Sequence, residues 1–309
     1  MPAMIWIELL RPFTLLPPLL GMWSGAAGAY GSGAMASLSP WEILWYLLLG
    51  SLSATLLNGA SNVLNQIYDL DIDRINKPER PIPSGRVGRV AAGRYCAALY
   101  AVSIGVSFGI QPAGRPEVFW IVVLTAFLTW IYSAPPVRAR KHWWLAPLVI
   151  AIPRGGLLKV AGWGMLAPTF SDSEPWLLGA VFFLFILGAA STKDFSDLRG
   201  DRACGVVTLP VRFGCRQASR LMAPFYVLPW LMVLGVLLPF RFLRVEPTAG
   251  YAFAAFMLLA SLWVARHLVL SGERLMERHI GEAAWKRLYG LMMVAQVGFA
   301  VLYLAFGLR

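Results

Sequence analysis

The sequence predicts an all-α fold, a polytopic membrane bundle of about nine transmembrane helices around a central cavity that opens at the cytoplasmic side. Three observations support it. Hydrophobic residues make up 58% of the chain and charged residues only 14%, whereas soluble domains average about 45–50% and 25%. Apolar runs close to the ~20 residues that span hydrocarbon recur along the whole length. Finally, basic residues gather in alternate connections between these runs.

The apolar runs fill the chain, so we predict one integral-membrane domain over residues 1–309 with no separate soluble domain. The N-terminal MPAMIWIELLRP has no basic start before its apolar run, which argues against a secretory signal. The expected helices lie near residues 12–31, 42–64, 91–110, 117–133, 144–166, 175–193, 221–240, 249–270 and 287–307.

The net charge of +11 has a topological explanation. Basic residues follow the second, fourth and sixth expected helices and lie between the eighth and ninth, whereas 32–41 and 167–174 contain no Lys or Arg. This positive-inside pattern places the N-terminus and the basic loops in the cytoplasm and the C-terminus outside, as expected for a bacterial inner membrane. We therefore expect contact with membrane lipid and no nucleic-acid partner. No CxxC motif, Cys/His cluster or Walker-type loop is present.

A stripe of polar residues ends the second expected helix, in NVLNQIYDLDIDRINKPERPIPSG, residues 62–85. At 100° per residue its members share one side of the helix, whereas Asp71 points the opposite way and should be solvated. Pro78 and the prolines after it should end the helix. The members of this stripe are Asn62, Asn65, Gln66, Asp69 and Asp73.

A second acidic stripe follows the sixth expected helix, in STKDFSDLRGDRACGVVTLPVRFG, residues 191–214. Asp194, Asp197 and Asp201 share a face if the helix continues through Gly200. Both stripes end helices that run from outside to inside, so they lie on the same side of the membrane. Hard oxygen ligands in two sets, flanked by Arg and Lys, suit Mg²⁺ and a diphosphate. The alternative is that these carboxylates are simply solvated at the membrane interface. That would explain a single acidic motif, but it explains two motifs on the same side of the membrane less well.

The chain resembles the UbiA superfamily of intramembrane prenyltransferases, whose signatures are NDxxDxxxD after the second helix and DxxxD after the sixth. Here the first reads NQIYDLDID and the second DLRGD. INKPERPIPSG and GDRACGVVTLPVRFG look most like the branch of chlorophyll synthases and digeranylgeranylglyceryl-phosphate synthases, and LRPFTLLPPLLG and YSAPPVRARK also fit. One position departs from the pattern: Gln66 stands where the family usually has Asp, which keeps an oxygen but loses the charge.

The resemblance implies a polyprenyl diphosphate whose head lies at the cytoplasmic mouth, and transfer of its prenyl group to a lipophilic acceptor. Mg²⁺ would be held by Asn65, Asp69, Asp73, Asp197 and Asp201, with Asp194 assisting deprotonation of the acceptor. Asn62 and Gln66 would lie beside the substrate, and Tyr132 would contact the diphosphate or belong to the interfacial aromatic belt. The candidate diphosphate clamps are Arg74, Lys77, Arg80, Arg138 and Lys141, with Lys193 and Arg202 as second-rank candidates.

Two ionisable residues interrupt the fifth expected helix, APLVIAIPRGGLLKVAGW. Arg154 lies near mid-depth after a proline that should kink the helix. An ionisable residue inside the bilayer is a functional candidate. It either faces the cavity, where it places an acidic or carbonyl-bearing acceptor or the diphosphate, or it pairs with an acid or with carbonyls of a broken helix. Lys159 is expected to snorkel toward the outer interface.

Two other functions use the same features. A membrane terpene cyclase would ionise the same diphosphate and quench the cation internally. A cation-coupled transporter would need acids at mid-membrane on broken helices, whereas these acids lie at helix ends, which favours an enzyme. The acceptor stays open among a quinone precursor, a chlorophyllide-like acid and a glycerol-phosphate ether.

Overall fold

The computed structural model describes residues 2–308, and every regular element in that range is a helix. The longer helices are α2 (Leu16–Gly31), α3 (Pro40–Tyr68), α5 (Arg89–Ser107), α6 (Glu117–Ser133), α9 (Glu174–Ala189), α13 (Pro247–Ser271) and α14 (Arg278–Phe306). The shorter ones are α1 (Pro2–Leu10), α4 (Leu70–Asn76), α7 (Leu145–Ala151), α8 (Leu158–Gly164), α10 (Asp194–Ala203), α11 (Leu209–Met222) and α12 (Pro224–Met232). Single turns of 3-10 or π helix join them: η1 (Pro12–Leu15), η2 (Pro112–Gly114), η3 (Ala139–Lys141), η4 (Ile152–Leu157), η5 (Ala190–Lys193), η6 (Val233–Leu237) and η7 (Gly272–Met276).

Local sequence explains where the long helices begin. Ser39 and Glu42 form a capping box at the start of α3, with Pro40 as its first helical residue. The side chain of Glu246 accepts hydrogen bonds from the backbone N–H groups of Thr248 and Ala249, and so caps α13. These helices therefore start where polar residues can satisfy their first N–H groups.

Each of the nine expected segments has a helical counterpart, but nine spans are not confirmed. Within residues 2–308, seven helices are long and apolar enough to cross a membrane, and an eighth is counted if the bent pair Met4–Leu10 and Pro12–Gly31 is one span. The ninth candidate, α6, is a shorter apolar helix. A bend of 49° precedes the first expected helix, because Arg11 adopts a left-handed φ of 56° between α1 and η1.

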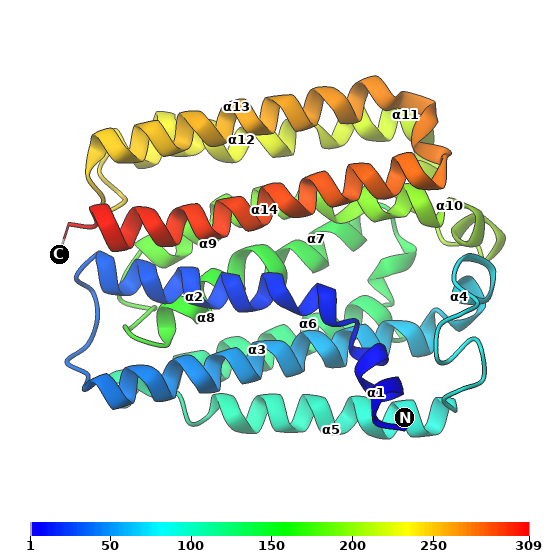
Figure 1. Cartoon of the computed structure of the whole chain (residues 1–309), viewed down its shortest axis with the longest axis horizontal. Helices are drawn as coiled ribbons and strands as arrows, with labels where there is room; N and C mark the ends of the chain where they lie inside the picture. The colour runs from blue at the N-terminus through cyan, green and yellow to red at the C-terminus, as the bar shows by residue number, and fades with distance from the viewer. Residues whose placement is uncertain (1, 309) are drawn as a thin grey trace.

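The bundle is held together by helices that lie lengthwise against one another (Figure 1). α3 contacts α5, α2 contacts both α8 and α14, and α9 contacts α12. Glycine permits the closest of these approaches, since a Cβ on Gly25 would meet the backbone of α8 and one on Gly162 would meet the backbone of α2. Small residues at such crossings are typical of membrane helices.

The two helices that carry the acidic motifs lie at one end of the bundle (Figure 1). α4 continues from the end of α3, and α10 continues from α9 through η5. The two short helices contact each other, and Figure 1 shows them at the same end, away from the C-terminus. The predicted meeting of the two stripes is thus built by two helix extensions, and α10 does continue through Gly200.

Candidate active site

The junction between α4 and α10 fixes the distance between the two acidic motifs. The side-chain amide of Asn76 donates to the backbone oxygen of Asp197 at 2.9 Å, and its oxygen accepts from the N–H of Gly200 at 3.1 Å. A Cβ at position 200 would collide with this amide, so glycine is required for the contact. Asn76 thereby anchors the end of the first motif on the backbone of the second.

The first stripe stays on one face although the helix breaks at Asp69. Helical hydrogen bonds persist across this break: the backbone N–H of Asp69 donates to the carbonyl oxygen of Asn65, and that of Asp73 donates to the carbonyl oxygen of Asp69. The amide of Asn65 donates to the Asp69 carboxylate at 2.5 Å. Asp69 and Asp73 are buried, whereas Asp71 is exposed and pairs with Arg74 on the outside of the bundle. The predicted division between inner and outer carboxylates is confirmed.

Basic side chains neutralise the buried carboxylates across the two motifs. Nε of Arg140 lies 3.0 Å from Asp69, and a terminal nitrogen of the same guanidinium lies 3.5 Å from Asp201. Burial acts to lower the pKa of Arg140, but the two carboxylates outweigh it and hold that pKa above its ordinary value. The guanidinium is thus a permanent positive link between the motifs.

Two cations from the loop after α4 hold further carboxylates. One nitrogen of Arg80 reaches both oxygens of Asp73, at 2.8 and 2.6 Å. Lys77 donates to Asp197, which also lies 3.5 Å from Lys193. Burial lowers the pKa of Lys77, and the charge of Asp197 opposes that shift. The basic loop that follows the first motif therefore folds back onto the acids.

The donor set suits a hard cation, although it does not form a complete cage. Asp201 is 0% exposed, and neither of its carboxylate oxygens accepts a hydrogen bond within the described part of the chain. The guanidinium of Arg140 lies 3.5 Å from one of these oxygens and donates no hydrogen bond to it, so the cost of burying the oxygen pair is only partly offset. Among residues 2–308, however, no group of three or more Asp, Glu, His or Cys side chains converges on one point. The residues therefore fit a Mg²⁺ ion that takes part of its coordination from a ligand, which is its usual behaviour.

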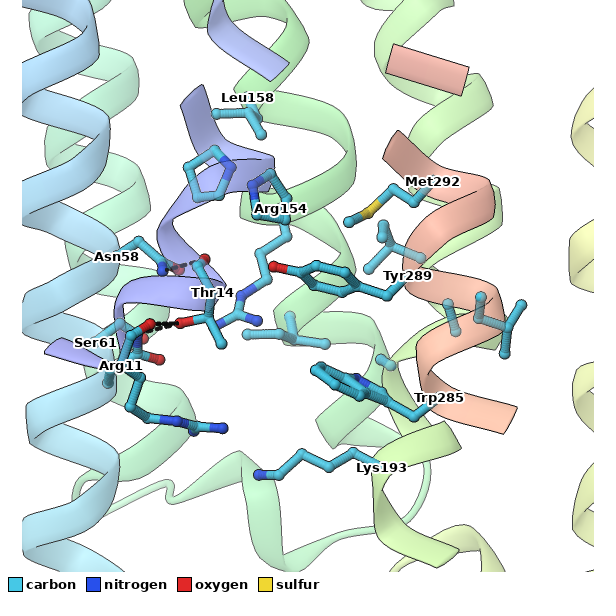
Figure 2. Close-up of a pocket in the computed structure, with 18 of the residues that line it drawn as sticks. Arg11, Thr14, Asn58, Ser61, Arg154, Leu158, Lys193, Trp285, Tyr289 and Met292 are labelled. Carbon is cyan, nitrogen blue, oxygen red and sulfur yellow. Dashed lines mark hydrogen bonds between the residues drawn. The ribbon is translucent and has the colours of Figure 1, made fainter. Parts of the chain in front are cut away.

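A cavity opens beside these acids and extends between the helices (Figure 2). Six of the residues predicted for the site line it: Asn62, Asn65, Tyr132, Arg154, Lys193 and Asp194. The other predicted carboxylates, Asp69, Asp73, Asp197 and Asp201, do not line it. Arg11, Arg154 and Lys193 extend into the same space, with Trp285 and Tyr289 of α14 facing them. The inner wall is apolar and includes Leu158, Phe185, Ile186, Leu288 and Met292. A cationic mouth thus leads into an apolar interior.

Those six predicted residues reach the cavity wall itself, and Arg140 joins them as a seventh member that the sequence did not single out. A second, smaller cavity shares Pro18, Asn58, Arg154 and Leu158 with the first and continues between α3 and α6. Its remaining wall is mostly apolar. The two cavities together offer a path for a chain that is charged at one end and apolar along its length.

Arg154 is directed into the cavity by the irregular turn η4. Pro153 interrupts the helical ladder, and the chain passes through a single π turn at Ile152–Leu157. Gly155 lies against the backbone of α9, where a Cβ would collide with Phe182. Arg154, the preceding residue of the turn, lines the cavity. This is the location given by the first of its two expected placements, and its role there stays a prediction.

The expectation that Lys159 snorkels is wrong. Its side chain is 1% exposed and donates to the hydroxyl of Ser24. The ammonium also lies 4.4 Å from the centre of the Phe182 ring. α8 packs so closely on α2 that the lysine is enclosed between α2 and α9 and cannot reach an interface.

Several predicted substrate contacts lie elsewhere. Arg74, Lys141 and Arg202 are exposed on the outside and do not line the cavity. Lys77, Arg80 and Arg138 each contact a buried carboxylate of the acidic motifs. Gln66 is 1% exposed, and its amide donates to the backbone oxygens of Leu9 at 2.9 Å and Asn62 at 3.0 Å. A glutamine at this position ties α3 to α1, and an aspartate could not donate these bonds.

Most of the cavity wall was not predicted from the sequence, including the cationic Arg11 and Arg140 and the aromatic Trp285 and Tyr289. Arg11 lies within LRPFTLLPPLLG, and an arginine so close to an apolar run was a usable signal. Arg140 stands among three basic residues of one loop, and nothing in their spacing distinguishes the inward one. Trp285 and Tyr289 look like any aromatic residues near a helix end.

Comparison with known proteins agrees with this geometry. The model of the UbiA prenyltransferase family matches residues 16–273. The bacteriochlorophyll synthase 34 kDa chain of Chloroflexus aurantiacus is 31% identical over 233 residues, which cover 75% of this chain and 71% of that protein. Digeranylgeranylglyceryl phosphate synthase of Methanothermobacter thermautotrophicus is 35% identical over 197 residues, or 62% of this chain and 66% of that protein.

The fold is similar to that of a solved homologue. A UbiA homologue from Archaeoglobus fulgidus, bound to GPP and Mg²⁺, superimposes with a TM-score of 0.63 at 20% identity, and the match covers 93% of this chain and 99% of that one. The identity is low, so this similarity concerns the arrangement of helices.

Proposed function

This chain belongs to the UbiA prenyltransferase family, and we propose that it transfers a polyprenyl group from a polyprenyl diphosphate to a lipophilic acceptor in a Mg²⁺-dependent reaction that releases diphosphate. One observation carries the proposal: two buried acidic motifs meet at the mouth of a cavity that is cationic at its entrance and apolar inside. The seven long apolar helices and the family together make the chain an integral membrane protein.

The residues present would hold the metal at the junction of the motifs. Asn65, Asp69, Asp73, Asp197 and Asp201 supply the hard oxygen atoms that Mg²⁺ prefers. When bound, the ion would neutralise charge that builds on the diphosphate as it leaves. Lys77, Arg80 and Arg140, which now pair with these carboxylates, would be available to contact phosphate oxygens if the ion took their place.

The remaining groups would act on the two substrates. Lys193, Arg140 and Arg11 reach the cavity near the acids and would bind diphosphate oxygens. The allylic C–O bond breaks with its electron pair leaving on the diphosphate, and a nucleophilic atom of the acceptor forms the new bond to that carbon. Asp194 lines the same space and would accept the proton from the acceptor. The apolar wall would hold the prenyl chain and exclude water from the cation.

The proposal extends to topology. With α6 and the bent α1–α2 pair counted as spans, the chain would cross the membrane nine times. Its basic loops lie at the same end as α4 and α10, so the positive-inside rule favours a cytoplasmic mouth and N-terminus and an external C-terminus, in a bacterial inner membrane.

The test is incubation of purified protein with labelled geranylgeranyl diphosphate and Mg²⁺. Diphosphate released only with an added acceptor, together with a prenylated product in the lipid extract, is the expected result. Release without any acceptor would instead indicate cyclisation or hydrolysis. Absence of release with every acceptor class would count against enzymatic use of the site.

A further inference from the structure

The backbone bends sharply at Arg11, between α1 and η1. This residue has a left-handed φ of 56°, a conformation that is costly outside glycine and is often retained where function requires it. The bend interrupts the helical ladder, since the N–H of Thr14 donates to the carbonyl oxygen of Arg11 instead of that of Leu10. The carbonyl oxygens at the end of α1 therefore need donors from outside the helix.

Side-chain amides of α3 supply these donors. Gln66 donates to the carbonyl oxygen of Leu9 at 2.9 Å. Asn62 donates to that of Leu10, also at 2.9 Å. A third amide of α3 lies at position 58, so the amides at 58, 62 and 66 follow one another at intervals of one turn and share one face of the helix.

Two prolines beyond the bend leave further carbonyl oxygens without their helical donors. Residues 17 and 18 are both proline and have no N–H for the carbonyl oxygens four residues earlier, those of Phe13 and Thr14. The hydroxyl of Tyr289 donates to the first of these oxygens at 2.9 Å, and the amide of Asn58 donates to the second at 2.9 Å. Side chains of α3 and α14 thus hold the backbone of residues 9–14 in one conformation.

The bend directs the side chain of Arg11 into the cavity (Figure 2). Within residues 2–308, this guanidinium forms no hydrogen bond or ion pair. The charges that act on it are those of Asp73 and Asp197, one from each acidic motif, and of the cations Arg80 and Arg154. Arg11 therefore lies near the junction of the motifs with its hydrogen-bond donors free for an anion.

We propose that Gln66 is a positioning residue for the donor: with Asn58 and Asn62 it holds the strained bend that aims Arg11 at the diphosphate. Gln66 is 1% exposed and does not line the cavity, so it acts through the backbone and touches no substrate. Without its bond the strain at Arg11 would be released by a change of backbone conformation that turns the guanidinium away. The inference rests on the proposed prenyl transfer, and it gives a role to the position where this chain departs from the usual aspartate.

The experiment measures ligand binding to purified full-length protein in detergent, well below the melting temperature of each variant. Geranylgeranyl diphosphate with Mg²⁺ reports on the charged head, and geranylgeraniol reports on the same tail without the charge. Gln66→Met keeps the size of the side chain but cannot donate a hydrogen bond. It should weaken binding of the diphosphate by at least about threefold and leave binding of geranylgeraniol within about twofold.

A double-mutant cycle with Arg11 separates positioning from general loosening of the fold. Arg11→Met should weaken diphosphate binding by about 10- to 100-fold, as expected for loss of a hydrogen bond from a charged group. The double variant should bind within about twofold of Arg11→Met, because a positioning residue has no effect once the group that it positions is gone.

Gln111→Met is the matched control. Gln111 also donates to a backbone oxygen, that of Phe108 at 2.8 Å, in the connection after α5, and its loss should leave binding of both ligands within about twofold. If Gln66→Met does not fold, Gln66→Asn takes its place, since it keeps the amide on a shorter side chain and should show the same selective loss.

Three results would overturn the inference. These are equal weakening of both ligands by the substitution at Gln66, multiplication of the two single losses in the double variant, and unchanged diphosphate binding in either single variant. Failure of the wild-type protein to bind the diphosphate is a different result, because it would refute the proposed function itself.

Discussion

Nε of Arg140 lies 3.0 Å from the carboxylate of Asp69. The same guanidinium reaches Asp201 at 3.5 Å, so one side chain from the loop after α6 joins two motifs that are more than a hundred residues apart in sequence. The acids that are proposed to hold Mg²⁺ therefore lie in ion pairs with the protein's own cations. Stability and metal binding should therefore be linked through Arg140.

Arg140→Met should lower both stability and turnover. It leaves Asp69 and Asp201 buried without their shared cation, and breaking a buried ion pair costs about 3–5 kcal/mol. Added Mg²⁺ should raise the melting temperature of this variant more than that of the wild type, because the ion replaces the missing charge. Thermal unfolding in detergent with and without Mg²⁺ tests this. An equal response of both proteins to Mg²⁺ would contradict the proposed link.

Chelation of divalent ions should stop prenyl transfer and leave the wild-type fold intact. Each buried carboxylate pair is already compensated by Arg140, Arg80 or Lys77, so loss of the metal exposes no new unpaired charge. We expect product formation to vanish in EDTA and to return with Mg²⁺, with an unchanged melting temperature in the absence of substrate. A large fall in melting temperature on chelation would indicate a structural metal instead.

Asp197→Asn should reduce turnover by at least about 100-fold, a loss typical of removing one electrostatic contact to the transition state. The substitution keeps the size of the side chain. Lys77, which donates a hydrogen bond to Asp197, can still donate to the amide oxygen of the asparagine. The protein should remain extractable and monodisperse. Single-turnover assays with labelled donor measure the effect. Activity near the wild-type level would remove Asp197 from the metal site.

Lys77 and Arg74 belong to one predicted set of diphosphate clamps, but the structure separates them. The Lys77 side chain is 17% exposed and bonds Asp197, whereas that of Arg74 is 62% exposed and bonds the outward Asp71. Lys77→Met should lower kcat/KM for the donor by about tenfold or more, and Arg74→Met by less than about twofold, since exposed ion pairs contribute little. Similar losses in both variants would show that Arg74 also reaches the substrate.

Gln66→Asp should destabilise the protein, although it restores the residue that the family usually has there. The shorter carboxylate cannot donate to the backbone oxygens of Leu9 and Asn62, and unmade buried bonds of this kind cost about 1–3 kcal/mol. We expect a lower melting temperature at all Mg²⁺ concentrations. An unchanged melting temperature together with tighter Mg²⁺ binding would show that position 66 faces the metal after all.

Much of the site was predictable because it depends on local periodicity. The spacing of Asn65, Asp69 and Asp73 places them on one helical face whatever the rest of the fold does, and the same holds for Asp197 and Asp201. Asp71 is likewise forced outward. Apolar run lengths located the helices to within a few residues at most ends. The exceptions are α10 and α11, which extend helices beyond the expected apolar runs, and α14, which begins at Arg278 instead of near residue 287.

The sequence by itself determined the class of protein, the two acidic faces and their common end of the bundle, because these follow from hydrophobic length and from angles within single helices. Only the tertiary structure decided which cations turn inward: Arg140 rather than Lys141, and Arg154 into a cavity while Lys159 is enclosed. It also decided that Gln66 ties two helices together. Those outcomes depend on how each helix is rotated against its neighbours and on the path of each loop, and such long-range packing leaves no periodic signal in the chain.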